Sequence, residues 1–304
     1  MPKTFDRRFF LMGILLVLSA VSCNGREITF TPTSLPTATS RPVNTPVPPT
    51  QTASLVPTQT EPPLLGIGSR WTSPIDGMLM LYVPAGDFSM GTDVYDADDE
   101  KPAHVVHLSA FWIDQTEVTN AMYQLCVRAR VCAAPTSSAS YSYSSYYGNP
   151  QFADYPIIFV SWVDARDYCS WAGKRLPSEA EWEKAARGDD GRTYPWGEDP
   201  PGPAMANYNN QVGDTRAVGS YPAGASPYGA LDMAGNVAEW VADWYDPDYY
   251  PVSSASNPTG PESGEFRVLR GGSWFNMARA MRAAFRLSNY PDLQSDTLGF
   301  RCAR

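Results

Sequence analysis

Hydrophobic positions along the chain fall into short runs that glycine, proline and polar residues interrupt. Residues 78–83 (MLMLYV) form one such run, which ends at a Pro-Ala-Gly sequence. Residues 105–114 hold two more short apolar runs. Apolar runs of this length between turn residues are typical of β-strands. The pattern therefore predicts three short strands in this part of the chain.

Helix signals follow these strands. Thr119 has the residue type of an N-cap for a helix that reaches about residue 130. Two further helices begin at capping boxes and close at a glycine, at residues 161–173 and 178–188. Beyond residue 188 these patterns stop, and we expect much irregular structure.

Residues 135–150 are rich in serine and tyrosine. This composition recurs in adaptable binding loops. The alternative is a long insertion that its own tyrosines pack against the domain. Of these two interpretations, we favour the packed insertion.

The first 23 residues have the pattern of an export signal. Lys3, Arg7 and Arg8 precede an apolar run at residues 9–21, which is shorter than the roughly 20 residues that a transmembrane helix needs. Small residues then lead to Cys23, so we expect this cysteine to carry a lipid that anchors the protein to the bacterial cell membrane, facing outside. Secretion without a lipid and retention of an uncleaved signal are the alternatives.

A threonine- and proline-rich tract follows at residues 24–63, with nine prolines between Thr31 and Pro63. This composition cannot bury a hydrophobic core, so we expect the tract to be disordered. At about 3.1 Å per residue, it would reach on the order of 100 Å when extended. The sequence therefore predicts a single domain, residues 64–304, held away from the membrane by a tether.

Composition and charge limit the classes of partner. Hydrophobic residues make up 43% of the chain, which is enough for a substantial core, and the net charge is −9. An acidic chain does not bind nucleic acid by neutralising phosphates, so no nucleic acid partner is expected. Acidic residues concentrate in residues 93–100, which we expect to form a solvated loop; a bound cation is the alternative.

Four cysteines follow Cys23, namely Cys126, Cys132, Cys169 and Cys302. An even number of cysteines in an exported chain predicts two disulfides, with three possible connectivities. A bridge between the first two would fasten the first predicted helix to the loop that follows it. With only two histidines in the chain, neither a histidine-based metal site nor a Ser-His-Asp triad is expected.

Several segments occur in an order that resembles one enzyme family. They are MGTD with its acidic loop, DQTEVTNAMY, GKRLPSEAEWEKAARG, YPWG, DMAGNVAEW, RGGSW and GFRC. Over residues 71–304 this ordered set resembles the formylglycine-generating enzyme, or sulfatase-modifying factor, family. The resemblance implies a single α+β domain of the C-type-lectin-like class, with short twisted sheets, two main helices and much irregular structure. It also implies the disulfide Cys169–Cys302, which leaves Cys126 with Cys132.

The resemblance further implies two structural calcium sites. The first would use the side chains of Asp232 and Glu239 with the carbonyls of Gly235 and Val237; the second would use the side chains of Asn207 and Asp214 with the carbonyls of Tyr208 and Arg216. Oxygen ligands of this mix suit calcium. Ordinary loop hydrogen bonds and salt bridges are the alternative for both sets.

The chain departs from the family at the positions that carry its chemistry. The resembling oxidases have two cysteines after the Gly-Gly-Ser turn, in the pattern GGSxxCxxxxC, and these bind copper(I). Here Asn276 and Met281 occupy those positions. An amide and a thioether supply no thiolate, so copper is not expected.

Functions of different classes remain open. We favour a non-catalytic, surface-displayed module that binds an unidentified protein, peptide or glycan. The alternatives are a formylglycine-generating oxidase that converts a sulfatase cysteine, and a partner subunit of an envelope assembly. The ligand site would be lined by Trp274, Phe275, Asn276, Arg279, Arg282 and Tyr290. For Arg282, as for Arg286 and Arg301, pairing with core carboxylates such as Glu239 or Asp232 is the other interpretation.

Replacing Cys23 with serine tests the predicted anchor. A labelled fatty acid should enter the wild-type protein and not Cys23→Ser, because serine has no thiol to receive the lipid. Equal labelling of the two proteins, or labelling of neither, would contradict a lipid at this residue.

Overall fold

The computed structural model describes residues 65–95 and 97–304. The predicted export signal with Cys23, and the proline-rich tract, lie outside the described residues. Inside them, short strands and helices are joined by long irregular segments, in agreement with the expected α+β architecture.

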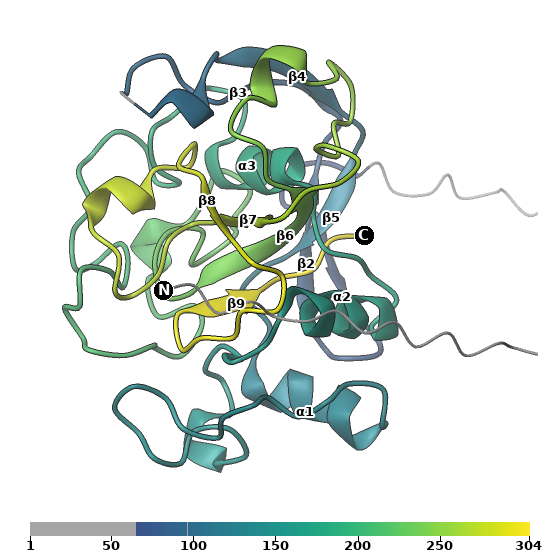
Figure 1. The fold of residues 1–304 in the computed structure, drawn as a ribbon, viewed down its shortest axis with the longest axis vertical. Coiled ribbons are helices and arrows are strands. Elements are labelled where there is room, and N and C mark those ends of the chain that lie inside the picture. Colours follow the sequence, from purple (N-terminus) through teal and green to yellow (C-terminus); the bar gives the residue numbers. More distant parts are fainter. Residues whose placement is uncertain (1–64, 96) are drawn as a thin grey trace, which may run out of the picture. The chain divides into compact units, whose positions relative to one another are not determined.

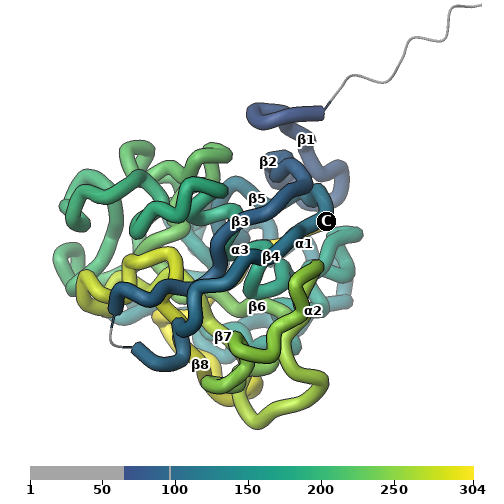
Figure 2. Tube along the Cα trace, turned by 90° about the horizontal axis from the view of Figure 1, so that it is seen from above, coloured from purple at the N-terminus to yellow at the C-terminus, as the bar shows by residue number. Residues whose placement is uncertain are grey.

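Two small antiparallel sheets come first along the chain. β1 (Arg70–Thr72), β2 (Leu79–Val83) and β5 (Phe111–Asp114) pair in the order β1-β2-β5, and β3 (Gly86–Met90) pairs with β4 (His104–Leu108). β2, β4 and β5 confirm the three predicted strands. β1 and β3 have too few apolar positions to be predicted. Figure 2 shows β3 and β4 side by side, and it shows the C-terminus near β5.

A four-stranded sheet lies at the centre of the domain (Figure 1). Its order is β8 (Leu287–Asn289), β7 (Arg267–Arg270), β6 (Ala238–Trp244) and β9 (Leu298–Phe300). β6 pairs in parallel with β9 and antiparallel with β7. Trp240, Val268 and Phe300 are buried on this sheet. Because the last strand of the chain pairs with β6, the C-terminal segment forms part of the core.

The α-helices begin at the predicted caps. They are α1 (Asn120–Arg128), α2 (Trp162–Trp171) and α3 (Glu179–Arg187). Thr119 caps α1, and both predicted capping boxes are present, at Ser161 and Ser178. α3 packs against β3, β4, β6 and β7, while α2 packs against β6 and α1 (Figure 1). The three helices that the caps predict are therefore all present, and they include the two main helices that the resemblance implies.

Short 3-10 helices occur in the irregular segments. Among the described residues they are η1 (Asp98–Glu100), η2 (Pro150–Phe152), η3 (Pro222–Gly224), η4 (Tyr250–Val252) and η5 (Ala278–Met281). In the same part of the chain, no helix is long and apolar enough to cross a membrane.

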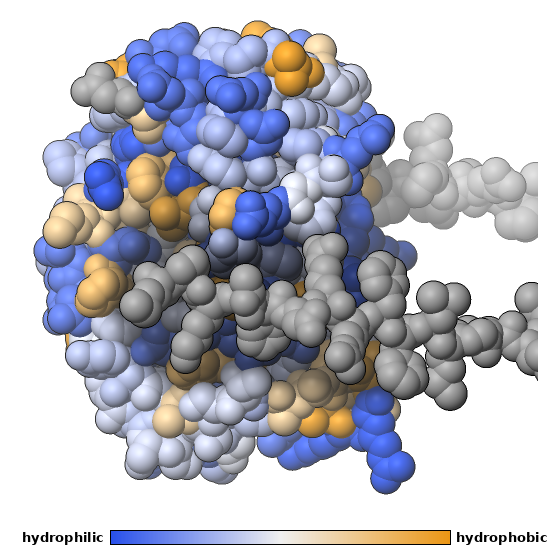
Figure 3. All heavy atoms as spheres, in the orientation of Figure 1, coloured by the Kyte–Doolittle hydropathy of each residue, from blue (hydrophilic) through white to orange (hydrophobic). Residues whose placement is uncertain are grey.

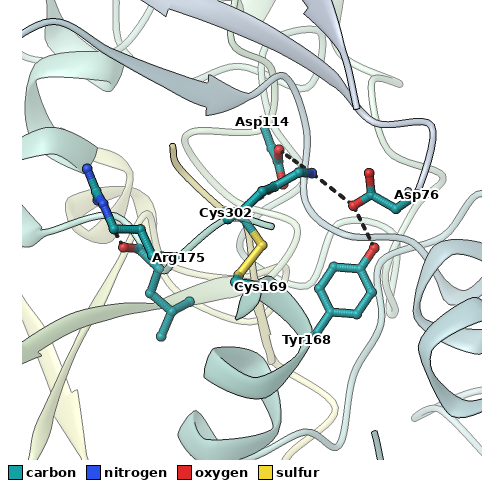
Figure 4. Close-up of a disulfide and its surroundings, with 8 residues drawn as sticks. Asp76, Asp114, Tyr168, Cys169, Arg175 and Cys302 are labelled. Carbon is teal, nitrogen blue, oxygen red and sulfur yellow. Dashed lines mark hydrogen bonds and ion pairs between the residues drawn. A yellow bond between two sulfur atoms is a disulfide. The ribbon is translucent and has the colours of Figure 1, made fainter. Parts of the chain in front are cut away.

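Both disulfides are present, as Cys126–Cys132 and Cys169–Cys302. Figure 4 shows the second bridge, which joins α2 to the segment after β9, beside a buried ion cluster. In this cluster, Nζ of Lys174 lies 2.8 Å from Asp76 and 2.9 Å from Asp114. Burial raises the pKa of Asp114 to about 6 in spite of the neighbouring ammonium group. The bridge and the ion cluster together fix the C-terminus against α2 and β5.

Three arginines near the C-terminus pair with buried carboxylates. The sequence left open whether such arginines bind a ligand or form ion pairs in the core, and these three form ion pairs. The pairs are Arg282 with Glu100, Arg286 with Glu179, and Arg301 with Glu239. Only the last of these partners is one that the sequence suggested. Because Glu100 is buried in its ion pair, the acidic loop of residues 93–100 is not wholly solvated.

Asp243 lies at the N-terminus of α3 without a basic hydrogen-bond partner among the described residues. Its Oδ2 accepts a hydrogen bond from the backbone N–H of Glu179, over 2.8 Å. Burial, together with the nearby charge of Glu179, raises the pKa of Asp243 to about 8. The folded protein therefore holds a proton on this carboxyl at pH values where the unfolded chain has released it.

Asp243→Asn should weaken the pH dependence of stability. The unfolded chain ionises at this residue near the ordinary pKa of about 4. Wild-type stability should therefore fall as the pH rises through the interval up to about pH 8, with a slope that approaches about 1.4 kcal/mol per pH unit. Denaturant unfolding at several pH values should show a smaller decline for Asp243→Asn, and the exposed Asp248→Asn serves as the control. Equal declines in wild type and Asp243→Asn would contradict the raised pKa.

Candidate functional site

The turn at residues 273–277 holds several of the predicted ligand-binding positions, and the loop at residues 207–210 lies beside it. The backbone N–H groups of Asn209 and Asn210 donate to the carbonyls of Asn276 and Trp274, both over 2.7 Å. The two loop residues have φ angles of 53° and 56°, a left-handed conformation that asparagine tolerates better than most residues. The loop and the turn therefore form one continuous surface.

Asn276 and Met281 have structural roles within this surface. Oδ1 of Asn276 accepts hydrogen bonds from the backbone N–H and the hydroxyl of Ser273, each over 2.9 Å. Met281 is fully buried. A Cβ atom at Gly272 would lie 2.7 Å from the terminal methyl of Met281. The asparagine therefore stabilises the turn, and the methionine fills the space behind it.

A cavity of about 400 Å³ opens beside the turn. Phe275, Met277, Arg279 and Phe285 line it together with the two asparagines of the loop. A second cavity of about 570 Å³ shares Arg279 and Phe285 with the first. Phe275 is 60% exposed and Met277 is 70% exposed. Figure 3 shows hydrophobic atoms in small groups among hydrophilic ones on this side of the molecule, one group lying at the left near η5.

The structure brings together only part of the predicted ligand site. The predicted residues that line the first cavity are Phe275, Asn276 and Arg279. Arg282 lines the second cavity, but both of its terminal nitrogens donate to Glu100. Trp274 is buried, and its Nε1 donates to the carbonyl of Asp296. Tyr290 packs against Phe266 and lines neither cavity.

In the first predicted calcium set, both carboxylates already accept hydrogen bonds. The two oxygens of Glu239 accept from Arg301, each over 2.7 Å, and Oε2 also accepts from Nε1 of Trp182. Oδ2 of Asp232 accepts from the backbone N–H of Gly219, over 2.6 Å. These contacts are of the kind that the alternative expects, and the presence of calcium at this set stays a prediction.

The two backbone members of this set, Gly235 and Val237, lie in the turn before β6. Gly235 has a φ of 83°, and a Cβ there would lie 2.3 Å from the carbonyl oxygen of Asn207. Only glycine permits this approach. The close approach joins the turn that carries the first set to the loop that carries the second.

Glu117 lies beside the first set, and the sequence interpretation missed it. Its Oε1 accepts from Nδ2 of Asn236 over 3.0 Å, while its buried Oε2 has no partner among the described residues. Burial and the nearby charge of Asp232 raise the pKa of Glu117 well above its usual range. Burial likewise raises the pKa of Asp232. A single acidic residue before a helix cap gives no local signal that it will be buried.

Among the largest influences on these carboxylates within the described residues, the basic side chain is Arg301, whose charge lowers the pKa of both Glu117 and Asp232. The cluster therefore carries more negative than positive charge when its carboxyls are ionised. Within the described ranges, no three acidic, histidine or cysteine side chains are placed to hold a metal ion on their own. A cation at this place would also need main-chain oxygen ligands, as the first predicted set supplies.

The second predicted set comes together around Asn207. Its Nδ2 donates to the carbonyl of Asp214 over 2.9 Å, while its buried Oδ1 has no partner among the described residues. The carbonyl of Arg216 accepts from Asn236 over 3.3 Å, and the carbonyl of Tyr208 accepts one backbone N–H. A buried oxygen without a partner costs about 1–3 kcal/mol. The chemistry and burial of this set therefore suit a bound cation.

The segment of residues 135–150 has features of a packed insertion and features of an adaptable binding loop. Tyr146 is buried and packs against Phe152, so part of the segment is held by its own tyrosines. Tyr141 is 69% exposed, and its ring centroid lies 5.3 Å from that of Trp274. One end of the segment is thus a packed insertion, whereas its tip borders the turn at residues 273–277.

Comparison with known proteins identifies the same family that the ordered sequence segments resemble. Residues 71–304 match the family model described as the sulfatase-modifying factor enzyme 1-like domain. The chain is 39% identical over 277 residues to a formylglycine-generating enzyme of Streptomyces coelicolor; the match covers 73% of this chain and 87% of that enzyme.

Two further matches show how widely the domain occurs. The chain is 38% identical over 241 residues to the serine/threonine-protein kinase pkn1 of Chlamydia pneumoniae, which covers 74% of this chain but 38% of the kinase. The solved structure of PvdO from Pseudomonas aeruginosa superposes with a TM-score of 0.67 at 30% identity, covering 79% of this chain and 99% of PvdO. The fold class expected from the sequence is therefore confirmed.

Proposed function

The chain belongs to the family of sulfatase-modifying factor enzyme 1-like domains, and from this membership we propose that it is a non-catalytic binding member. It binds a protein, peptide or glycan while tethered to the outer face of a bacterial cell membrane. The tether is the tract of residues 24–63, with a lipid at Cys23. Two disulfides in the domain support a location in an oxidising, extracytoplasmic compartment.

The observation that carries the proposal is the use made of Asn276 and Met281. In the resembling oxidases, two cysteines at these positions bind copper(I). Here the asparagine accepts hydrogen bonds from Ser273, and the methionine is buried. The four cysteines of the described residues are all in disulfides. A single thioether is a poor substitute for two thiolates, so copper is not expected at this place.

The ligand contacts the cavity beside the turn. Phe275 and Met277 offer exposed apolar side chains, and Arg279 offers a guanidinium group. Aromatic residues, methionine and arginine are the types enriched in protein interfaces. Arg282 supports this surface from behind through its pair with Glu100.

Formylglycine formation on a sulfatase cysteine is the alternative function, and the similarity to the Streptomyces enzyme is what favours it. Purified full-length protein should neither bind copper(I) tightly nor convert a cysteine to an aldehyde in a sulfatase-type peptide. The measurement is incubation with copper, oxygen and a thiol reductant, followed by mass spectrometry of the peptide. Turnover above a metal-free control would refute the non-catalytic assignment.

The double substitution Asn276→Cys and Met281→Cys provides the converse measurement. Gain of copper(I) binding by the double variant, and by neither single variant, would show that the two positions share one pocket. No gain would indicate that the turn holds the two side chains apart.

We also propose that calcium is a structural cofactor, held by the two predicted sets. Asn207 and Asp214 would bind one ion with the carbonyls of their loop, and the unpartnered Oδ1 of Asn207 supports this. Asp232 and Glu239 would contribute to a second ion, supported by the excess of negative charge around Arg301. Calcium would supply positive charge to buried oxygen atoms and would fix the loops that carry them.

Excess calcium should raise the melting temperature relative to a chelator, because a ligand that binds only the folded state stabilises it by about 2.7 kcal/mol at a hundredfold excess over its Kd. Asn207→Ala and Asp232→Ala should each lose part of this response, and magnesium should reproduce it weakly. Identical melting in chelator and in calcium would leave the two sets as ordinary loop contacts.

A further inference from the structure

The tip of the serine- and tyrosine-rich segment, residues 139–143, contacts the domain through the carboxylate of Asp214. Oδ2 of Asp214 accepts from the hydroxyl of Ser140 over 2.6 Å and from the backbone N–H of Ser142 over 2.8 Å. The hydroxyl of Ser142 also donates to the carbonyl of Gly213. The carboxylate of Asp214 is therefore one of the contacts that fix the position of the tip.

The same carboxylate belongs to the second predicted calcium set. Asp214 is buried, and no basic side chain is among its hydrogen-bond partners in the described residues. Asn207 lies next to it, with its amide bonded to the Asp214 carbonyl and its own Oδ1 unpartnered. The residue with the buried carboxylate and the residue with the unpartnered amide oxygen are thus in direct contact through the Asp214 carbonyl. A cation bound between their side chains would satisfy both oxygens.

The carboxylate has capacity for both partners. A carboxylate offers about four acceptor positions on its two oxygens. Oδ2 of Asp214 accepts the two donors of the tip, whereas Oδ1 accepts from the backbone N–H of Thr215 over 2.7 Å and from its hydroxyl only over 3.5 Å. One oxygen can therefore serve a cation while the other holds the tip.

The tip also reaches the ligand surface. The ring of Tyr141 packs against Trp274, and Trp274 packs against Phe275, with centroids 5.3 and 5.7 Å apart. The carbonyl of Trp274 accepts from Asn210, in the loop that begins with the cation ligand Asn207. The tip, the cation loop and the turn thus meet in one exposed surface.

We propose that Asp214 is shared between the cation and the tip, so that cation binding holds Tyr141 against Trp274 and completes the ligand surface. This inference rests on the proposed function, in which calcium occupies the second set. A cation that fixes the carboxylate also fixes the acceptor for Ser140 and Ser142. By linkage, an ordered tip strengthens cation binding by the same factor.

Chymotrypsin cleavage after Tyr141 measures the order of the tip without any need for the unidentified ligand. Full-length protein is digested in millimolar calcium or in chelator, and mass spectrometry follows each cleavage site. Cleavage after Tyr141 should be about tenfold faster in chelator, a typical size for coupling between two sites. Cleavage after the partly exposed Tyr249, which is followed by Tyr250 and not by proline, reports general opening of the domain and should change much less.

Two variants separate the tip from the ion. Ser140→Ala removes the hydroxyl donor, so cleavage after Tyr141 should be fast with and without calcium, while calcium still raises the melting temperature. Ser144→Ala is the matched control, because this serine is exposed and its hydroxyl has no hydrogen-bond partner among the described residues, and it should behave as wild type. Asp214→Asn should lose the calcium-dependent protection of Tyr141 and the part of the melting response that belongs to the second set.

The outcomes distinguish this inference from the calcium proposal. If calcium raises the melting temperature but leaves cleavage after Tyr141 unchanged, the coupling is wrong and the calcium site stands. If calcium changes neither, both are wrong, and the binding function is unaffected. Calcium-dependent protection that persists in Ser140→Ala would also overturn the role assigned to Asp214.

Discussion

Buried arginines hold together a domain that has little regular secondary structure. A guanidinium group has five N–H donors, and a carboxylate takes two of them, so donors remain for other acceptors. Arg301 uses its remaining donors on the carbonyls of Asp114, Gln115 and Leu231. Arg270 likewise donates to two carbonyls that follow η5. Irregular segments leave such carbonyls without strand or helix partners, and the arginines satisfy them.

Helix α3 shows why this arrangement needs charged partners. The helix is buried on almost every side, including Glu179 and Glu183. Arg286 donates to both oxygens of Glu179, and Arg270 donates to Glu183 over 2.6 Å. Removal of one partner from such a pair leaves a buried charge and typically costs about 3–5 kcal/mol. The pairs therefore fix the loops around α3 in one arrangement.

Local features of the fold could be predicted from the sequence, and contacts between distant positions could not. Thr119, Ser161 and Ser178 cap helices through bonds to residues three positions away, so their roles can be read locally. Arg282 lies 182 positions from its partner Glu100, and spacing alone suggested other partners. The ligand site likewise has a local part that the sequence predicts and a tertiary part that it does not. The turn at residues 273–277 was recognisable from its sequence, whereas the separation of Tyr290 from the cavity depends on tertiary packing.

The turn at residues 273–277 depends in the same way on a polar partner and on packing behind it. The turn needs an acceptor for the N–H and hydroxyl of Ser273, and the amide oxygen of Asn276 supplies it. A thiol is a weaker acceptor than an amide oxygen, so the asparagine defines the turn at least as well as a cysteine would. Met281 fills the volume behind Gly272 with apolar atoms. Asn276 and Met281 thus maintain the packing of the turn, and Phe275 and Met277 stay exposed on its surface.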